Sequence, residues 1–188
     1  MKKLALTTLV CTAALGVAVA SEPPAEVTEA RGLVKEFFTN LKGQLQAAMK
    51  AGGPVSAIQV CNVQAPAIAR NLAHDSGWEV GRTSLKLRNP ANRPDNWEQA
   101  VLEQFDARKA AGEAAEKMEF SEVVDAEGIK TFRYMKAIPT APLCVVCHGT
   151  DIDPYVDARL QELYPEDQAR GFKPGDIRGA FTIIERVP

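Results

Sequence analysis

A short run near the C-terminal end, Cys144-Val145-Val146-Cys147-His148, constrains the fold more than any other feature of the sequence. It brings two thiols and an imidazole together within one short segment. This spacing is typical of c-type haem attachment, because the two thiols add to the vinyl groups of the haem and the adjacent histidine becomes an axial ligand of the iron. The run therefore predicts one covalent haem c, attached through Cys144 and Cys147 and ligated by His148.

Two other chemistries use a similar set of side chains. A thioredoxin-like Cys-x-x-Cys belongs to a βαβ unit, whereas here the motif follows a predicted antiparallel hairpin. A zinc site would combine Cys144, Cys147 and His148 with Cys61, which together supply suitable donor atoms. Ligands at directly adjacent positions fit a tetrahedral metal poorly, so a zinc-binding domain is the less favoured alternative.

The N-terminus has the three parts of a secretory signal peptide. Lys2 and Lys3 precede an apolar run from Leu4 to Ala20, which ends in Val17-Ala18-Val19-Ala20 before Ser21. The run is shorter than the roughly 20 residues that a membrane span needs, so an uncleaved anchor is the weaker alternative. No second apolar span follows. We therefore expect cleavage after Ala20 and a soluble periplasmic protein that starts at Ser21.

Length and charge limit the organisation of the mature chain. Residues 1–20 are the expected signal peptide, residues 21–26 a short tail, and residues 27–188 a single domain large enough to bury a core. The formal net charge is −2, and removal of Lys2 and Lys3 brings it to −4. An acidic chain without a basic cluster argues against a nucleic-acid partner.

The first half of the domain has helical periodicity. Apolar residues predict a helix over 27–50, which Gly52-Gly53 ends. Pro54 suits the first turn of a second helix, which continues to Leu72 and carries Cys61 on its apolar face. Pro66 lacks the N–H that would bond the carbonyl of residue 62, so we expect a kink a turn beyond Cys61.

The second half reads mainly as strands. We expect a half-buried strand over 78–88, a helix opened by a capping box at Asp95 and Glu98, a hairpin of 118–124 with 129–138, a short helix over 154–164 and a last strand over 179–187. Helices followed by antiparallel strands predict an α+β fold. The polar side of the first strand carries Arg82, Lys86 and Arg88. These cations are candidates to pair with the two haem propionates, with an ordinary solvated face as the alternative.

The second axial ligand is less constrained by the residues alone. After the signal is removed, the candidates beside His148 are Cys61, His74, Met49, Met118 and Met135. Cys61 is the cysteine left over from the motif, and a free thiol in an oxidising compartment survives best when it is buried or bound to metal. His74 lies at a helix end where exposure is the ordinary outcome, and methionines more often fill cores. The residues favour Cys61 and leave the others open.

Four segments resemble a known family. They are 57–66 (AIQVCNVQAP), 80–98 (VGRTSLKLRNPANRPDNWE), 144–149 (CVVCHG) and 175–181 (GDIRGAF), and the resemblance extends over about 27–187. The family comprises c-type haem domains with a PAS-like fold, long catalogued as a domain of unknown function. Some members stand alone in the periplasm or thylakoid lumen, and others form the extracytoplasmic part of sensor histidine kinases. The resemblance implies iron held by His148 and Cys61, with a PAS-like antiparallel sheet flanked by N-terminal helices.

These expectations together describe an exported monohaem protein with a low-potential, Cys/His-ligated haem. We expect it to act in redox or gas sensing or in electron transfer, with a redox partner protein or a separate signalling protein, and with a diatomic gas as a further ligand. We do not expect an enzyme, because catalysis at iron needs an open coordination position that a bound Cys61 fills. A haem enzyme of the peroxidase or nitrogen-oxide reductase type is the alternative.

Overall fold

The computed structural model describes residues 23–126 and 128–186. The expected signal peptide, the start of the tail and the end of the last predicted strand at Val187 lie outside these residues. The elements are, in chain order, α1 (Ala25–Gln59), the π-helical segment η1 (Val60–Gln64), α2 (Ala65–Ser76), β1 (Glu79–Thr83), η2 (Pro90–Asn92), α3 (Asn96–Ala110), η3 (Ala115–Lys117), β2 (Glu119–Ala126), β3 (Ile129–Pro139), α4 (Val145–His148), α5 (Pro154–Leu163) and β4 (Ile177–Arg186).

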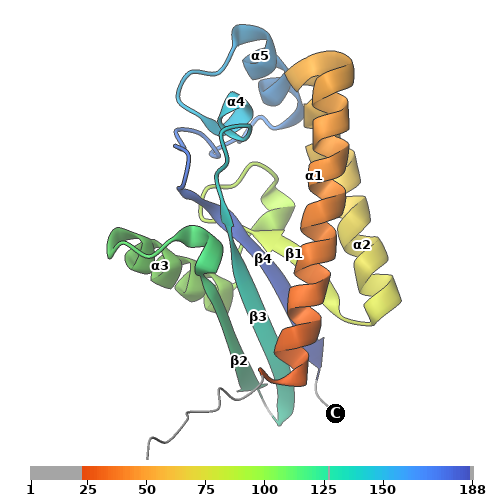
Figure 1. The fold of residues 1–188 in the computed structure, drawn as a ribbon, viewed down its shortest axis with the longest axis vertical. Helices are drawn as coiled ribbons and strands as arrows, with labels where there is room; N and C mark the ends of the chain where they lie inside the picture. Colours follow the sequence, from red (N-terminus) through yellow and green to blue (C-terminus); the bar gives the residue numbers. More distant parts are fainter. Residues whose placement is uncertain (1–22, 127, 187–188) are drawn as a thin grey trace, which may run out of the picture.

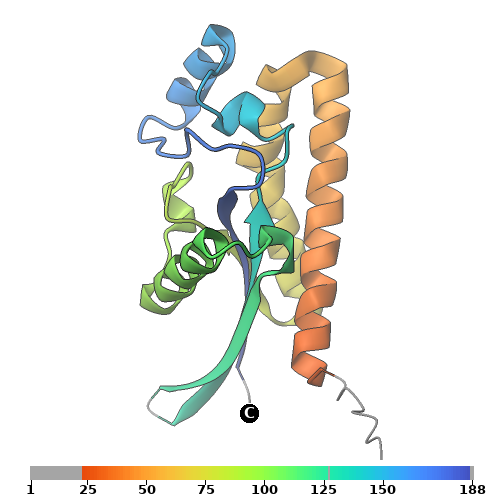
Figure 2. The ribbon, with the colours of Figure 1, turned by 60° about the vertical axis from the view of Figure 1, so that its left-hand side comes forward.

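One four-stranded antiparallel sheet forms the centre of the molecule, in the order β1-β4-β3-β2. The helices α1 and α2 cover one face of the sheet and α3 covers the other (Figures 1 and 2). Each face has its own apolar core, because strand side chains alternate between the two sides. Phe37 of α1 and Phe181 of β4 meet in the first core, and Phe105 of α3 and Met135 of β3 lie in the second. The fold is thus α+β, as the order of predicted elements indicated.

Helix α1 is two helices joined at a sharp kink. Gly52 and Gly53 have non-helical backbone angles, and Gly53 adopts a positive φ of 69°. A residue with a Cβ rarely adopts this conformation, so the glycine pair ends the first helix where the sequence predicted. Pro54 then lies in the first turn of the second helix, where its missing N–H has no partner to lose.

The predicted irregularity near Cys61 is present in a different form. Residues Val60–Gln64 form a π-helical turn, in which the N–H of Ala65 bonds the carbonyl of Val60. We predicted a kink one turn beyond Cys61, but the widened turn includes Cys61 itself. The cause is Pro66, which offers no donor to the preceding turn, so the chain upstream adopts the wider hydrogen-bond pattern.

The strand predicted over 78–88 is wrong in its second half, because β1 ends at Thr83. The Ser84 hydroxyl donates to the carbonyl of Arg178 at 2.8 Å and accepts from the N–H of Lys86 at 3.2 Å, which turns the chain out of the sheet. Arg88, predicted on the polar side of this strand, is buried, whereas Leu85 is exposed. The capping box at Asp95, the 118–138 hairpin and the short helix after Asp153 are confirmed.

The Cys-x-x-Cys-His motif lies at one end of the sheet. Helix α4 carries it, next to α5 and the end of α1 that contains the kink (Figure 1). Among residues 23–126 and 128–186, no helix combines the length and the apolar character needed to cross a membrane.

Candidate functional site

The Cys-x-x-Cys-His motif forms a single helical turn. Cys144 caps it, and the carbonyl of Cys144 accepts from the N–H groups of Cys147 at 3.2 Å and His148 at 2.9 Å. The preceding loop is fixed to the start of β4, because Thr140 donates to Asp176 at 2.7 Å. Both thiols and the imidazole therefore project from one short, anchored turn.

The ring of His148 is held through Nδ1 by a backbone carbonyl. Its Nδ1 lies 2.9 Å from the carbonyl oxygen of Ala169, which can only accept, so Nδ1 carries the hydrogen and Nε2 keeps its lone pair. Burial, reinforced by the positive charge of Arg178, lowers the pKa of His148 well below its ordinary value. A neutral histidine with its other nitrogen bonded to a carbonyl is the arrangement that metal-ligating histidines adopt.

The sequence-distant thiol of Cys61 lies beside the motif. Burial raises the pKa of Cys61, while Arg82, Arg88 and Arg178 act in the opposite direction. A charge on Cys144 also affects Cys61, and a charge on Cys61 affects Cys147. Ile58, three residues before Cys61, belongs to the apolar cluster against which Cys147 packs, so the fold brings the segment of Cys61 near the α4 turn.

Arg88 contacts the backbone of the motif. It forms a two-point ion pair with Asp167, with N···O distances of 3.0 Å, and both side chains are less than 10% exposed. It also donates to the carbonyls of Cys147 at 2.5 Å and Ala169 at 3.1 Å. Arg88 was predicted as a propionate partner; here its Nε and Nη2 already donate to Asp167 and to the two backbone carbonyls beside His148.

Arg178, at the start of β4, completes the surroundings of the imidazole. Its Nε lies 3.2 Å from Nδ1 and 3.5 Å from Nε2 of His148, and Nη1 of Arg88 lies 3.4 Å from Nε2. Burial, followed by repulsion from Arg88 and Arg82, lowers the pKa of Arg178 to about 10. Within the described chain, no carboxylate oxygen lies within 4.0 Å of this guanidinium. Sequence analysis missed Arg178, although it lies inside the segment 175–181 that carries the family resemblance.

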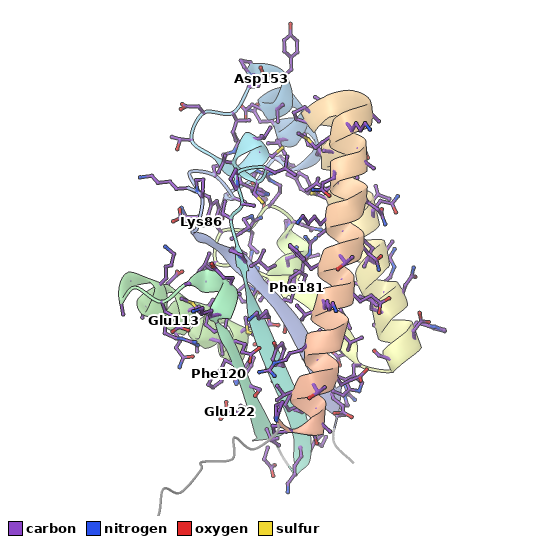
Figure 3. The ribbon with its side chains drawn as sticks, viewed as in Figure 1. Lys86, Glu113, Phe120, Glu122, Asp153 and Phe181 are labelled. Carbon is purple, nitrogen blue, oxygen red and sulfur yellow. The ribbon has the colours of Figure 1, made fainter. Side chains whose placement is uncertain are left out.

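Arg82 and Lys86 occupy different surroundings. Arg82, on β1, lies 5.4 Å from the ring centroid of Phe37, and burial lowers its pKa while Cys61 raises it. Lys86 is exposed, and its Nζ lies 5.2 Å from the ring centroid of Phe172. Figure 3 shows Lys86 on the side of the molecule away from α1. Arg82 and Cys61 thus interact electrostatically, whereas Lys86 lies over the ring of Phe172.

The other candidate axial ligands lie elsewhere. His74 is near the end of α2 with its side chain 89% exposed, bonded to Asp75. Met118 and Met135 are fully buried against α3, in the core on the other face of the sheet. Met49 is half-buried on α1. The ligation itself stays a prediction, but the placement favours Cys61.

The donor set fits a haem better than a bare metal ion. In the described parts of the chain, no three His, Cys, Asp or Glu side chains are arranged to hold a metal ion, although all four proposed zinc ligands lie there. The cluster offers an imidazole nitrogen and a separate thiol for an iron, two thiols on one turn for vinyl groups, and cations for propionates. Arg82 and Arg178 have no carboxylate partner in these parts of the chain, as expected where an anionic group belongs.

Residues 20–186 match the family described as Tll0287-like. The chain belongs to the Tll0287-like family. A solved structure, the crystal structure of the cyanobacterial haem protein Tll0287, superimposes on it with a TM-score of 0.66 and 22% sequence identity, covering 89% of this chain and 97% of that one. At this identity the likeness shows a shared fold. No curated protein matches the chain.

The family membership confirms the resemblance that the four sequence segments carried. Every residue of the Tll0287-like cluster described above lies inside the matched range. The long N-terminal helix and the four-stranded antiparallel sheet of this chain are therefore the fold of a known haem protein.

Proposed function

We propose that this Tll0287-like chain is an exported c-type haem protein with a single haem. Cys144 and Cys147 would attach the haem, and His148 and Cys61 would ligate its iron. The observation that carries this proposal is that the segment of Cys61 packs beside a Cys-x-x-Cys-His turn whose histidine is held through Nδ1 by the carbonyl of Ala169. When bound, the haem would supply an iron that exchanges one electron.

The role that these residues support best is redox or gas sensing or electron transfer. A thiolate ligand is anionic and favours ferric iron, so ligation by Cys61 predicts a low potential. Burial raises the pKa of Cys61, and the positive charges of Arg82, Arg88 and Arg178 act against this, in favour of the thiolate. These residues would bind and orient the cofactor, and His148 and Cys61 would both hold its iron, which does not favour a haem enzyme.

The proposal also includes a PAS-like fold, export from the cytoplasm and a partner protein. We propose that the antiparallel sheet with its N-terminal helices is the PAS-like arrangement that the resemblance implies. Export by residues 1–20 predicts a periplasmic protein that starts at Ser21, and N-terminal sequencing of the periplasmic fraction tests it. A full-length chain found only in membranes would contradict export. A redox protein or a separate signalling protein would be the partner.

Covalent haem attachment is the first test. The denatured protein should keep its colour, and its mass should exceed that of residues 21–188 by one haem. Cys144→Ala and Cys147→Ala should each lower the haem yield sharply, because each removes one thioether bond. Cys61→Ser is the matched control, since it removes a thiol from the same cluster but no attachment site. A colourless protein that contains zinc would contradict the proposal.

Ligation by Cys61 is the second test. Cys61→Ser should raise the midpoint potential by about 100 mV or more, within the range that axial ligands span, and should change the ferric low-spin spectrum. His74→Ala should change neither, since that side chain is exposed. If the outcome were reversed between the two variants, His74 would be the ligand.

A measurement on the reduced protein separates sensor from carrier. Reduction lowers the positive charge of the iron and weakens its hold on a thiolate. If CO or NO then binds and Cys61 is released, redox state is coupled to the π-helical turn, which suits a sensor. If the reduced protein excludes CO, the site suits a carrier.

A further inference from the structure

Residues 167–172, between α5 and β4, lie against the motif without forming a helix or a strand. We call this segment the strap. The N–H of Gln168 donates to the carbonyl of Leu87 at 2.7 Å, and the N–H of Phe172 donates to the carbonyl of His148 at 2.9 Å. The backbone of the strap is therefore fixed both to the motif and to the segment that follows β1.

The strap reaches the imidazole through Ala169, which is fully buried. The carbonyl of Ala169 accepts from Nδ1 of His148 at 2.9 Å. The N–H of Ala169 donates to Oδ1 of Asp167 at 2.9 Å. One backbone group of Ala169 is thus held by the ring and the other by a carboxylate, so the direction of the carbonyl depends on Asp167.

The carboxylate of Asp167 is only 3% exposed and accepts four hydrogen bonds. Oδ1 accepts from the N–H of Ala169 at 2.9 Å and from Nε of Arg88 at 3.0 Å. Oδ2 accepts from Nη2 of Arg88 and from Nε of Arg170, each at 3.0 Å. A carboxylate offers about four acceptor positions, so all of them are used. Loss of one donor therefore alters how the others are held.

Arg170 connects this buried carboxylate with α5. Its Nε donates to Asp167, while its Nη1 donates to Asp157 of α5. The side chains of Arg170 and Asp157 are 33% and 29% exposed, so the outer end of this contact lies near the surface. A continuous series of hydrogen bonds thus runs from α5 through the strap to the ring of His148.

A second ion pair on α5 provides a contrast. Arg159 pairs with Glu162 at 2.5 Å, within the last turns of the same helix, and the Glu162 side chain is 65% exposed. Within the described residues, neither side chain forms an ion pair with the strap. Arg159 therefore has the same charge as Arg170 and the same helix as Asp157, but no connection to His148.

We propose that Asp157 and Arg170 are positioning residues for His148, which couple α5 to the haem iron through the strap. This inference rests on the proposed function, because it concerns a haem ligated by His148. A hydrogen bond from Nδ1 makes the imidazole a stronger donor to a metal. A stronger donor favours ferric iron, so a firmly held strap lowers the midpoint potential and a loosened strap raises it.

The sign of the change in midpoint potential separates positioning from a simple charge effect. Arg170→Gln removes a positive charge, which by itself favours the oxidised form and lowers the potential. If Arg170 holds the strap, the same substitution loosens the Nδ1 hydrogen bond and raises the potential. We expect the rise, as a shift of about twofold to fivefold in the equilibrium between oxidised and reduced protein, the scale of one hydrogen bond.

Two further variants complete the redox titration. Asp157→Asn should raise the potential as well, and the double variant with Arg170→Gln should shift it no further than the larger single change, because both residues belong to one series of contacts. Arg159→Gln is the matched control, since it removes the same charge from α5. It should leave the potential unchanged or lower it slightly.

The proton on Nδ1 of His148 gives a readout that does not depend on haem. NMR measures its exchange with solvent in the protein as purified. The chain has only two histidines, and the other, His74, is exposed, so the two ring signals are readily told apart. Arg170→Gln and Asp157→Asn should each speed this exchange by about fivefold, because the hydrogen bond to the strap opens more often. Arg159→Gln should leave it unchanged.

The outcomes keep this inference apart from the proposed function. A raised potential and faster exchange in both strap variants support the coupling. A lowered potential for Arg170→Gln, or unchanged exchange in both variants, overturns it, while covalent haem in the same samples leaves the proposed function intact. Faster exchange in a protein whose mass contains no haem supports the positioning of His148 and contradicts the proposed function instead.

Discussion

Two groups of charged residues in this protein shift the pKa of an arginine in opposite directions. In the first, between α1 and the β2–β3 hairpin, Arg31 donates to Glu119, which also accepts from the Tyr134 hydroxyl at 2.7 Å. The hydrogen bond with Glu119 raises the pKa of Arg31. In the second, at the motif end of the sheet, burial and the neighbouring arginines lower the pKa of Arg178 to about 10.

The two groups differ in whether each arginine has a carboxylate partner. Arg31 and Glu119 form an ion pair with each other, so their charges are balanced by the protein itself. Arg82 and Arg178 have no carboxylate in contact within the described residues, and they face thiols and an imidazole. Buried like charges at close range cost stability unless a counter-charge is added. We therefore propose that the motif end is organised around an anionic group that the described residues do not supply.

The largest predicted effect concerns the buried ion pair of Arg88 and Asp167 at the motif end. Asp167→Asn should lower the free energy of unfolding by about 3–5 kcal/mol, because it leaves the buried cation Arg88 without its counter-charge. Urea denaturation of haem-loaded protein at pH 7 measures this. Asp151→Asn, at an exposed position, is the control and should stay within about 0.5 kcal/mol. A loss below about 1 kcal/mol for Asp167→Asn would show that Arg88 is not held by this pair.

The sequence predicted those parts of the fold that depend on neighbours along the chain. The glycine pair at Gly52-Gly53, the capping box at Asp95 and the hairpin turn each act within a few residues. Their signals are therefore visible in a single sequence. The Cys-x-x-Cys-His motif is equally local, which explains why its residues could be named at once.

The parts that could not be predicted depend on contacts distant in sequence. The β1 strand ends at Thr83 because Ser84 bonds the carbonyl of Arg178, more than ninety residues away. Arg88 is buried because Asp167 lies opposite it, which no alternation pattern reveals. Arg178 was missed for the same reason, since its role arises only where β4 passes His148.

The second prediction tests the complete network at the hairpin. Glu119→Gln should lower the free energy of unfolding by about 1–2 kcal/mol at pH 7, because the charge-assisted hydrogen bond from Arg31 is lost. That bond lowers the pKa of Glu119 below its ordinary value of 4.5. The stabilisation is thus present above pH 4.5 and is lost as the pH falls through the lower, folded-state value. Unfolding curves from pH 7 to pH 3 should show wild type and variant converging, and a constant difference would contradict this.

The smallest predicted effect is the one that most sharpens the comparison, because its sign depends on the cofactor. Arg178 bonds Ser84 at 3.0 Å and the carbonyl of Lys86 at 3.3 Å, but it is also repelled by Arg88 and Arg82. In haem-free protein, made by combining Cys144→Ala with Cys147→Ala, these contributions oppose each other. Arg178→Gln should therefore change the free energy of unfolding by no more than about 0.5 kcal/mol, or raise it.

In haem-loaded protein the same substitution should be destabilising, because the counter-charge that offsets the repulsion is then present and Arg178 becomes one of its partners. Arg31→Gln is the matched control, since it removes an arginine whose partner Glu119 belongs to the protein, and it should cost about 1 kcal/mol in both forms. Urea denaturation of the four variant–cofactor combinations measures all of these values. Equal losses for Arg178→Gln with and without haem would mean that its charge is compensated by the chain alone, and the contrast between the two groups would then be wrong.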